Sequence, residues 1–335
     1  MSRRFSLRDM RWFAQRIENR AARDVLKVYS TQLNIIRAEI ALLYERYADS
    51  TGLLPMAEVQ KYNRLSNTEK AILAAMSVAA IKQVSITKKA LTEIYVNSYY
   101  RTGYAVDVMV GANTGSAKLT DKLIATVWKN DLDRIGWPYR TKQQAMLGAR
   151  QIQAALASGL RQGKSYTQIA KEVARITGKT AWQAERIVRT EAHRIREEAT
   201  WKAYDEAENM GVKGTRIWLS TLDDRTRDMH QDMDQREATI ITDTRTDGED
   251  RYLFQLPDGA IGYPGNTGEA HHDINCRCDT RYDIEGFTPQ TRRAKLTDAE
   301  YAERKAAAGE GELVPRSEVI SNMSYHEWAQ MKGIE

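Results

Sequence analysis

Two cysteines and three histidines are the residues in this chain best suited to bind a metal. Cys276 and Cys278 are one residue apart, so on a β-strand both thiols would point to the same face. Zinc is bound by thiolates and imidazoles in a tetrahedral arrangement. The nearest imidazoles in the sequence are those of His230, His271 and His272. We therefore expect a zinc site made of His230, His272, Cys276 and Cys278, with His271 as the alternative to His272.

The same cysteines can also be explained without a metal. Cys-x-Cys is not the usual Cys-x-x-Cys knuckle, and the sequence does not fix the number of ligands. Two buried thiols can pack as small apolar groups, with His230 hydrogen-bonded to nearby backbone or carboxylate. A disulfide framework does not follow from a pair at this close spacing. A zinc ion would suit a loop-rich module with little core, whereas packed thiols would need no cofactor.

A second group of residues could perform acid–base chemistry. Asp223, Arg225, Arg227 and His230 follow one another closely, and Asp and His are common general acids and bases. However, no nucleophile elbow and no phosphate-binding glycine loop accompany them. Asp223 and Arg227 are one helical turn apart, as are Arg227 and His230, so buried ion pairs explain the same residues. The sequence therefore favours a structural role over catalysis.

The order of the motifs resembles that of a known protein family. An Arg189-Thr190-Glu191 segment precedes Trp218, the run from Asp223 to His230 follows, and Asn275-Cys276-Arg277-Cys278 comes last. Over residues 165–283 this order is similar to the head-morphogenesis family of tailed phages, the Mu F-like minor capsid proteins. The resemblance implies a scaffold role for its motif residues, which are Arg189, Glu191, Trp218, Asp223, Arg227 and Asn275.

The resemblance also implies a function and a location. Proteins of this kind are packaged in small numbers inside the capsid, where they associate with the portal. We expect a minor head protein, made in the host cytoplasm, that acts in head morphogenesis and in DNA packaging or ejection. Its partners would be the portal protein, a capsid or scaffolding protein, and packaged double-stranded DNA held by non-specific contacts. The implied role is not enzymatic and requires no cofactor.

The elements that must position these residues follow from hydrophobic periodicity. Apolar residues recur at helical spacing near the N-terminus, for example at Phe13, Ile17, Ala21 and Val25. Alternation of apolar and polar residues near Trp218 is typical of a strand. Glycine at position 178 predicts the end of a helix. The expected helices are 7–48, 66–109, 142–158, 166–177, 180–210 and 223–233, with a further one near 119–130, and the expected strands are 215–220, 252–255 and 275–284.

These elements predict a mainly α protein with a small α+β module. We expect four consecutive regions: a long-helical arm at 1–110, a helical region at 111–214, a Mu F-like α+β module at 215–287 and an extended tail at 288–335. The tail would carry short helices at 298–308 and 324–332. Tyr325, Trp328 and Met331 lie on adjacent faces of the second one, as in helices that dock to a partner.

Charge is distributed unevenly along the chain. Residues 1–210 contain 34 Lys and Arg against 21 Asp and Glu, whereas residues 211–335 contain 16 against 24. A basic N-terminal part predicts weak contact with DNA or with an acidic protein surface, although solvated helices explain the same excess. No stretch of 18 apolar residues is present and the N-terminus lacks a secretory signal, so we expect no membrane contact before infection.

A different class of function has to be considered alongside the structural one. The 215–283 module could be a metal-dependent, nuclease-like enzyme that is carried in the virion and delivered with the DNA. The lack of a catalytic motif in the sequence argues against it. Metal content measured together with nuclease activity distinguishes the two functions.

Overall fold

The structure is a computed structural model whose residues form two compact units. It describes residues 7–112, 117–120, 124, 131–132, 135–243, 248–284, 290–309 and 312–333. The helical unit comprises Trp12–Ile94 and Ala125–Ala192, and the mixed unit comprises Met1–Arg11, Tyr95–Ile124 and His193–Glu335. Both units are built from segments far apart in the sequence. The predicted division into four consecutive regions stays a prediction.

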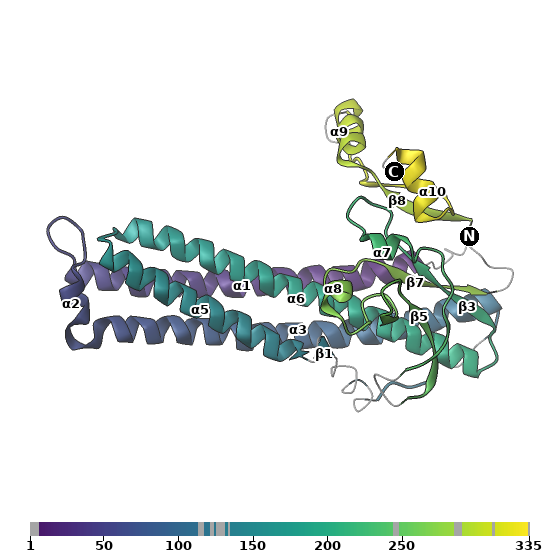
Figure 1. The fold of residues 1–335 in the computed structure, drawn as a ribbon, viewed down its shortest axis with the longest axis horizontal. Helices are drawn as coiled ribbons and strands as arrows, with labels where there is room; N and C mark the ends of the chain where they lie inside the picture. The colour runs from purple at the N-terminus through teal and green to yellow at the C-terminus, as the bar shows by residue number, and fades with distance from the viewer. Residues whose placement is uncertain are drawn as a thin grey trace. The chain divides into compact units, whose positions relative to one another are not determined.

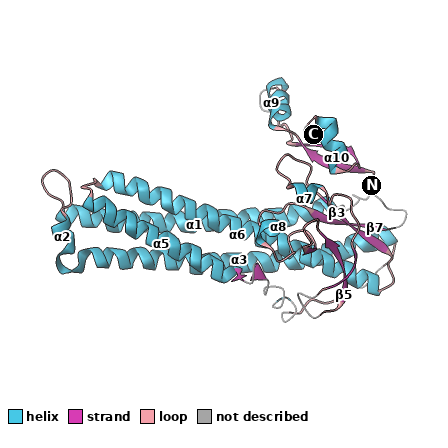
Figure 2. Cartoon of the chain, in the orientation of Figure 1, coloured by secondary structure: helices cyan, strands magenta, loops and turns pink. Residues whose placement is uncertain are grey.

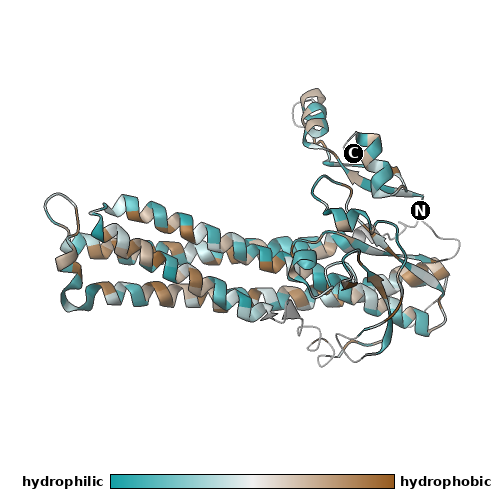
Figure 3. Cartoon of the chain, viewed as in Figure 1, coloured by the Kyte–Doolittle hydropathy of each residue, from teal (hydrophilic) through white to brown (hydrophobic). Residues whose placement is uncertain are grey.

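Long helices supply most of the helical unit and run side by side within it (Figure 1). Hydrophobic and hydrophilic residues alternate along these helices (Figure 3). Two short elements, α2 (Met56–Gln60) and the 3₁₀ helix η1 (Lys61–Asn63), precede α3. The long helices are α1 (Leu7–Tyr47), α3 (Arg64–Val110), α5 (Trp137–Arg161) and α6 (Tyr166–Asn209).

Buried polar contacts join the helices of this bundle. The Gln83 side chain on α3 accepts a hydrogen bond from the Tyr29 hydroxyl on α1 at 3.0 Å. The Gln83 amide donates to the carbonyl of Ala184 on α6 at 3.3 Å. On α5, a Cβ added to Gly148 would lie 2.6 Å from the Thr180 hydroxyl oxygen on α6. Glycine is therefore what allows α5 and α6 to approach closely at this point.

The prediction that Gly178 ends a helix was wrong. Helix α6 continues through this position from Tyr166 to Asn209. The hydroxyls of Thr177 and Thr180 donate to the carbonyls of Val173 and Ile176, at 2.8 and 3.0 Å, and both threonines are buried. Packing of this buried face outweighs the cost of one glycine, which is about 1 kcal/mol in a helix interior.

The mixed unit holds most of the strands (Figure 2). Strand β3 (Gly214–Leu219) pairs antiparallel with β7 (Asp279–Ile284), so that Trp218 lies opposite Thr280. A second sheet has the order β4 (Thr239–Thr242), β5 (Asp250–Gln255) and β6 (Ile261–Gly262). Two single-turn helices, α7 (Asp228–Gln231) and α8 (Ala270–Asp273), carry the histidines. A two-residue pair, β1 (Asp131–Leu132) and β2 (Ile135–Gly136), belongs to the helical unit instead.

Two boundaries in this module differ from the sequence prediction. The helix expected over 223–233 is reduced to α7, because Asp223 accepts hydrogen bonds from the Arg225 amide and the Thr226 hydroxyl and so forms a turn. The strand expected from 275 begins at Asp279, so the cysteines precede it. Most of the helix expected near 119–130 lies outside the described residues.

The C-terminal segment is folded rather than extended. Strand β8 (Thr291–Lys295) pairs with β9 (Ser317–Ser321), and α9 (Asp298–Ala307) and α10 (Tyr325–Lys332) confirm the two predicted helices. Tyr325 and Trp328 are buried against Leu222, Ala294 and Ala329. These two aromatic side chains are thus part of an internal core, and the prediction that they dock to a partner was wrong.

One stretch, Met56–Val110, has the length and composition of a membrane-crossing helix, with a mean hydropathy of 1.3 over its most apolar window. The core helix of a water-soluble protein passes the same test. Ile72, Met76 and Ile94 of this stretch are fully buried within the protein. The sequence-based statement that no such stretch exists was therefore too strong, although length and composition alone carry little weight.

Candidate metal centre

A residue in the left-handed backbone conformation, Asn275, precedes the two thiols and directs them into the interior of the mixed unit. Asn275 has a φ of 57°, a conformation that asparagine tolerates better than most residues. The backbone N–H of Cys276 then donates to the carbonyl of Asp273 at 3.1 Å. Cys276 and Cys278 are both buried in a cluster that also contains Trp218 and Phe254. The tight turn therefore places two thiols in an apolar environment although neither lies on a strand.

His230 is the imidazole that faces both thiols. Its Nδ1 atom lies 3.8 Å from Cys276 Sγ and 3.5 Å from Cys278 Sγ. The ring is buried, and the edge of Trp218 packs against it with ring centres 5.3 Å apart. The three side chains converge closely enough to hold one metal ion.

The two thiols differ in their affinity for a proton. A hydrogen bond from Cys276 lowers the pKa of Cys278 well below its usual value, against the effect of burial, and His230 lowers it further. The hydrogen bond to Cys278, together with burial, raises the pKa of Cys276 well above its usual value. One proton is therefore shared by a buried pair, and Cys278 is the thiol that ionises first.

The structure places His272 away from the thiols, on the other side of His230. Its Nδ1 atom lies 3.2 Å from His230 Nε2, and its own Nε2 lies 2.8 Å from Asp258 Oδ2. Of the four predicted ligands, the structure thus brings together His230, Cys276 and Cys278, while His272 contacts the opposite imidazole nitrogen. His272 is fully buried, and burial lowers its pKa while Asp258 opposes that shift.

Asp258 joins the two neighbouring histidines in a second, partly exposed group. The Nε2 atom of His271 lies 3.2 Å from Asp258 Oδ2. The hydrogen bond from His271 lowers the pKa of Asp258 well below its usual value, burial opposes this, and the bond from His272 adds to the lowering. Sequence reasoning missed Asp258, whose position between Pro257 and Gly259 indicated only a turn.

Besides Asn275, three of the predicted motif residues support this site. Trp218 packs against His230, as described above. Asp223 binds Arg277 through two oxygens and Lys295 at 3.2 Å; burial opposes ionisation, but these cations lower the pKa of Asp223 to about 2. Arg227 donates to the carbonyls of His272 and Ile274. Asp223 thus holds the residue between the two cysteines, and Arg227 holds the segment that precedes them.

The other two motif residues lie in the helical unit. Arg189 on α6 forms ion pairs with Glu18 on α1 at 2.6 Å and with Glu185 at 2.8 Å. The buried Glu191 carboxylate pairs with Arg140 on α5 at 2.5 Å. Both residues therefore connect helices of the bundle.

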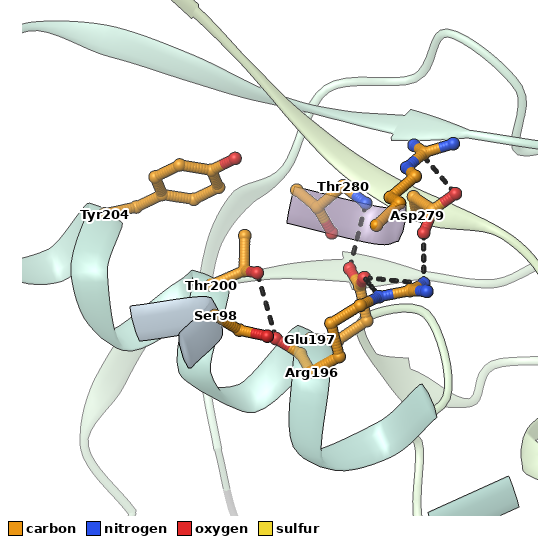
Figure 4. Close-up of a pocket in the computed structure, with 8 residues that line it drawn as sticks. Ser98, Arg196, Glu197, Thr200, Tyr204, Asp279 and Thr280 are labelled. Carbon is orange, nitrogen blue, oxygen red and sulfur yellow. Dashed lines mark hydrogen bonds and ion pairs between the residues drawn. The ribbon is translucent and has the colours of Figure 1, made fainter. Parts of the chain in front are cut away.

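A buried charge cluster occupies a different part of the mixed unit (Figure 4). Asp279 binds the guanidinium groups of Arg11, at 2.7 Å, and Arg196. Burial raises the pKa of the neighbouring Glu197 to about 7, although Arg196 opposes this. Burial also lowers the pKa of His193 to about 3, with Arg196 adding to the shift. His193, Glu197 and Asp279 lie within metal-binding distance of one another, but two arginines already neutralise the carboxylates.

A small pocket lies against this cluster. Its volume is about 30 Å³, enough for one water molecule. Tyr204 lines it with a buried hydroxyl that has no hydrogen-bond partner in the described part of the protein. Sequence reasoning missed this cluster. The one available signal was His193 four residues before Glu197, which places both on one face of a helix.

Residues 150–281 match the family model described as "Phage Mu protein F like protein". This match covers the thiols, His230 and His272, and it confirms the resemblance predicted from the order of the motifs. The segment that carries the candidate metal centre is thus similar to Phage Mu protein F.

Two relatives are similar to most of this chain. The "Minor head protein GP7" of Bacillus phage SPP1 is 27% identical over 320 residues, which cover 96% of this chain and 95% of that protein. The "NAD(+)--arginine ADP-ribosyltransferase EFV" of Enterococcus faecalis (strain ATCC 700802 / V583) is 27% identical over 271 residues, or 80% of this chain. The match spans 52% of that longer protein. No solved structure matches this chain.

Proposed function

We propose that this protein is a minor head protein of a tailed phage. One observation carries the proposal: its similarity to the SPP1 minor head protein covers 96% of this chain and 95% of that protein. The shared length includes the helical bundle as well as the Mu F-like region, so the two proteins correspond from end to end. A head protein is made in the host cytoplasm and resides in the virion, and we place this one inside the capsid.

Portal association is the specific interaction that we propose for it. The support is the resemblance to portal-associated Mu F-like proteins, together with the extended helical unit, whose exposed faces offer a large binding surface. The test is co-sedimentation of the purified full-length protein with portal oligomers, with complete proheads and with proheads that lack the portal. Binding to the first two and not to the third is expected. No sedimentation with either portal oligomers or proheads would remove the proposal, and binding only to portal-free proheads would point to a capsid or scaffolding partner.

Contact with packaged DNA is the second interaction that we propose, in support of a role in packaging or ejection. The helical unit contains 24 Lys and Arg against 13 Asp and Glu, a net charge of +11, whereas the mixed unit contains 26 against 32. Such an excess favours weak, sequence-independent binding that falls steeply with salt. Lys82, Lys89, Lys171 and Lys179 are exposed on α3 and α6.

Charge reversal at these positions tests the DNA contact. We expect Lys82→Glu, Lys89→Glu, Lys171→Glu and Lys179→Glu together to weaken binding of full-length protein to duplex DNA and to flatten its salt dependence. The matched control makes the same change in net charge on exposed residues of the mixed unit, through Arg236→Glu, Arg251→Glu, Arg293→Glu and Lys305→Glu. Equal loss in both variants would argue for a general charge effect, and salt-independent binding would argue against phosphate contact.

The enzymatic alternative is a metal-dependent nuclease built on the module. The group that could serve it is Asp258, His271 and His272, because it is partly exposed and its ligand atoms lie close together. The ADP-ribosyltransferase relative is named for an enzymatic activity, but this chain spans about half of that protein. A nuclease assay with added divalent metals distinguishes the functions: cleavage abolished by His271→Ala would favour the enzyme.

A further inference from the structure

We propose that Cys276 Sγ, Cys278 Sγ and His230 Nδ1 bind one zinc ion in the interior of the mixed unit. Thiolate and imidazole ligands are the combination that zinc prefers in proteins. All three side chains are buried, and their ligand atoms face one another. His272, which the sequence suggested as a fourth ligand, orients His230 and does not touch the metal.

The separations between these atoms fit a tetrahedral zinc ion. Typical bonds of about 2.3 Å to sulfur and about 2.0 Å to nitrogen place a zinc-bound sulfur and a zinc-bound nitrogen about 3.5 Å apart at a tetrahedral angle. The Sγ atoms lie 3.8 and 3.5 Å from His230 Nδ1. The pre-formed geometry therefore requires little rearrangement when zinc binds.

Without a metal, His230 Nδ1 can form a hydrogen bond with only one of the two sulfurs, and the other thiol pairs with its neighbouring thiol instead. A neutral imidazole nitrogen either accepts one hydrogen bond or donates one. His230 Nδ1, however, has two sulfur neighbours at similar distances. Cys278 Sγ also lies 3.9 Å from the Ser220 hydroxyl, a long contact even for sulfur. One zinc ion would satisfy both sulfurs and the nitrogen together.

A chain of hydrogen bonds behind His230 supports the same assignment. When Nδ1 binds a metal, the proton of His230 lies on Nε2, which can donate to His272 Nδ1 at 3.2 Å. His272 Nε2 then donates to Asp258 Oδ2 at 2.8 Å. Metal-binding histidines usually donate their second N–H to such a partner, which fixes the tautomer and the ring orientation. Arg227 holds the backbone carbonyl of His272 and so keeps this chain in place.

Three protein ligands leave the fourth zinc position to a water molecule or another small ligand. Within the described residues, the group of His, Cys, Asp and Glu atoms at this point contains only these three. The surrounding Trp218, Met233 and Phe254 side chains exclude bulk solvent. The site is therefore expected to stabilise the module and to hold zinc tightly.

Metal analysis of the full-length protein tests the proposal directly. We expect about one zinc per chain after purification without a tag, or after incubation of the apoprotein with zinc and removal of excess metal. Replacement of zinc by cobalt should give the thiolate-to-cobalt charge-transfer absorption of two sulfur ligands and the strong visible bands of a tetrahedral ion. Less than about one-tenth of a metal per chain under both conditions would end the proposal, given the tight binding expected of such sites.

Four variants separate the ligands from the orienting residue. Cys276→Ser with Cys278→Ser, and His230→Ala alone, should abolish metal binding. His272→Ala should retain the stoichiometry and the cobalt spectrum but lower the affinity about 10- to 100-fold, as the loss of an outer-shell partner does. His326→Ala, at an exposed histidine on α10, is the control and should change nothing. Complete loss of metal in a folded His272→Ala variant would overturn the assignment, because His272 would then be a ligand.

Discussion

Arg292 and Asp234 form a bidentate ion pair that is buried from solvent. Nη1 of Arg292 lies 2.7 Å from Oδ2 of Asp234, and Nη2 lies 3.1 Å from Oδ1. The arginine also donates to the carbonyl of Ser220, and Asp234 accepts from the Ser220 backbone N–H, both at 2.7 Å. The pair thus ties the paired strands β8 and β9 to the segment that follows β3. The C-terminal residues are for this reason part of the folded module.

Breaking this ion pair should destabilise the protein strongly. Asp234→Ala leaves a buried guanidinium group without its counter-charge, a change that typically costs about 3–5 kcal/mol. We expect a large drop in the free energy of unfolding of the mixed unit, measured by urea denaturation with tryptophan fluorescence. Arg293→Ala changes the exposed neighbour on the same strand and should cost less than about 0.5 kcal/mol. Similar stability of both variants would show that the pair contributes little.

Trp328 should behave as a core residue and not as a binding residue. Its side chain is fully buried beside Tyr325 and Leu222, so Trp328→Ala should cost about 3–5 kcal/mol. Met331 on the same helix is 53% exposed, and Met331→Ala should leave stability nearly unchanged. Thermal unfolding followed by circular dichroism measures both. A stable Trp328→Ala variant that loses only portal or prohead binding would restore the docking role.

Gly265 should tolerate no side chain, for two reasons. Its φ is +73°, and an added Cβ would lie 2.6 Å from Cδ2 of the buried His193. The left-handed conformation alone costs about 1–2 kcal/mol for alanine. Gly268, three residues later, has a φ of +83° and open space around it. It is therefore a matched control for the cost of placing alanine in the left-handed backbone conformation. We expect Gly265→Ala to lower the unfolding temperature clearly more than Gly268→Ala; equal effects would mean that His193 moves aside without cost.

Glu197 should make the mixed unit less stable as the pH rises towards 7. Burial raises its pKa from 4.5 to about 7, so between these values the folded state binds a proton that the unfolded state does not. The contribution of this proton to the free energy of unfolding is complete below about pH 4.5 and is lost as the pH rises through 7. Glu197→Gln removes it, and the variant should therefore gain stability relative to the unaltered protein across this window.

Urea denaturation at pH 5 and pH 8 measures this effect. Each pKa unit of the shift corresponds to about 1.4 kcal/mol, so a difference of a few kcal/mol is the upper limit. His193 changes stability with pH in the opposite sense. Burial lowers its pKa to about 3, so its contribution to the free energy of unfolding is lost as the pH falls below 6.5. Glu237→Gln, at an exposed position, is the control. A pH-independent difference between Glu197→Gln and the unaltered protein would contradict the prediction.

Local sequence was enough to predict most of the elements. The helical periodicity of Phe13, Ile17 and Val25 predicted α1, and the capping residues Thr297 and Ser324 mark the starts of α9 and α10. The alternation around Trp218 predicted β3. These signals are local, because helix and strand periods and capping bonds involve residues within a few positions of one another.

The order of the motifs also predicted the similarity to the Mu F-like family, and the residue types predicted three of the side chains at the candidate metal centre. Cys276, Cys278 and His230 are close in space as expected, since a Cys-x-Cys pair and a rare histidine form a strong compositional signal. The sequence could not show which groups the His272 imidazole contacts, because these contacts depend on how α7 and α8 pack. Only the tertiary structure placed it against His230 Nε2 and Asp258.

Tertiary packing also decided the conformation and burial of residues whose local sequence signals compete. Gly178 ends a helix by local rules, yet α6 continues because its threonine face is buried in the bundle. The sequence alone predicted that Tyr325 and Trp328 form an exposed docking face. In the structure, residues of β8 and β9 and Leu222 cover both side chains. The buried cluster of Arg11, Arg196, Glu197 and Asp279 joins residues that are up to 268 positions apart. Such contacts leave no periodic trace in the sequence, because burial and charge pairing between distant segments are set by the three-dimensional arrangement of the chain.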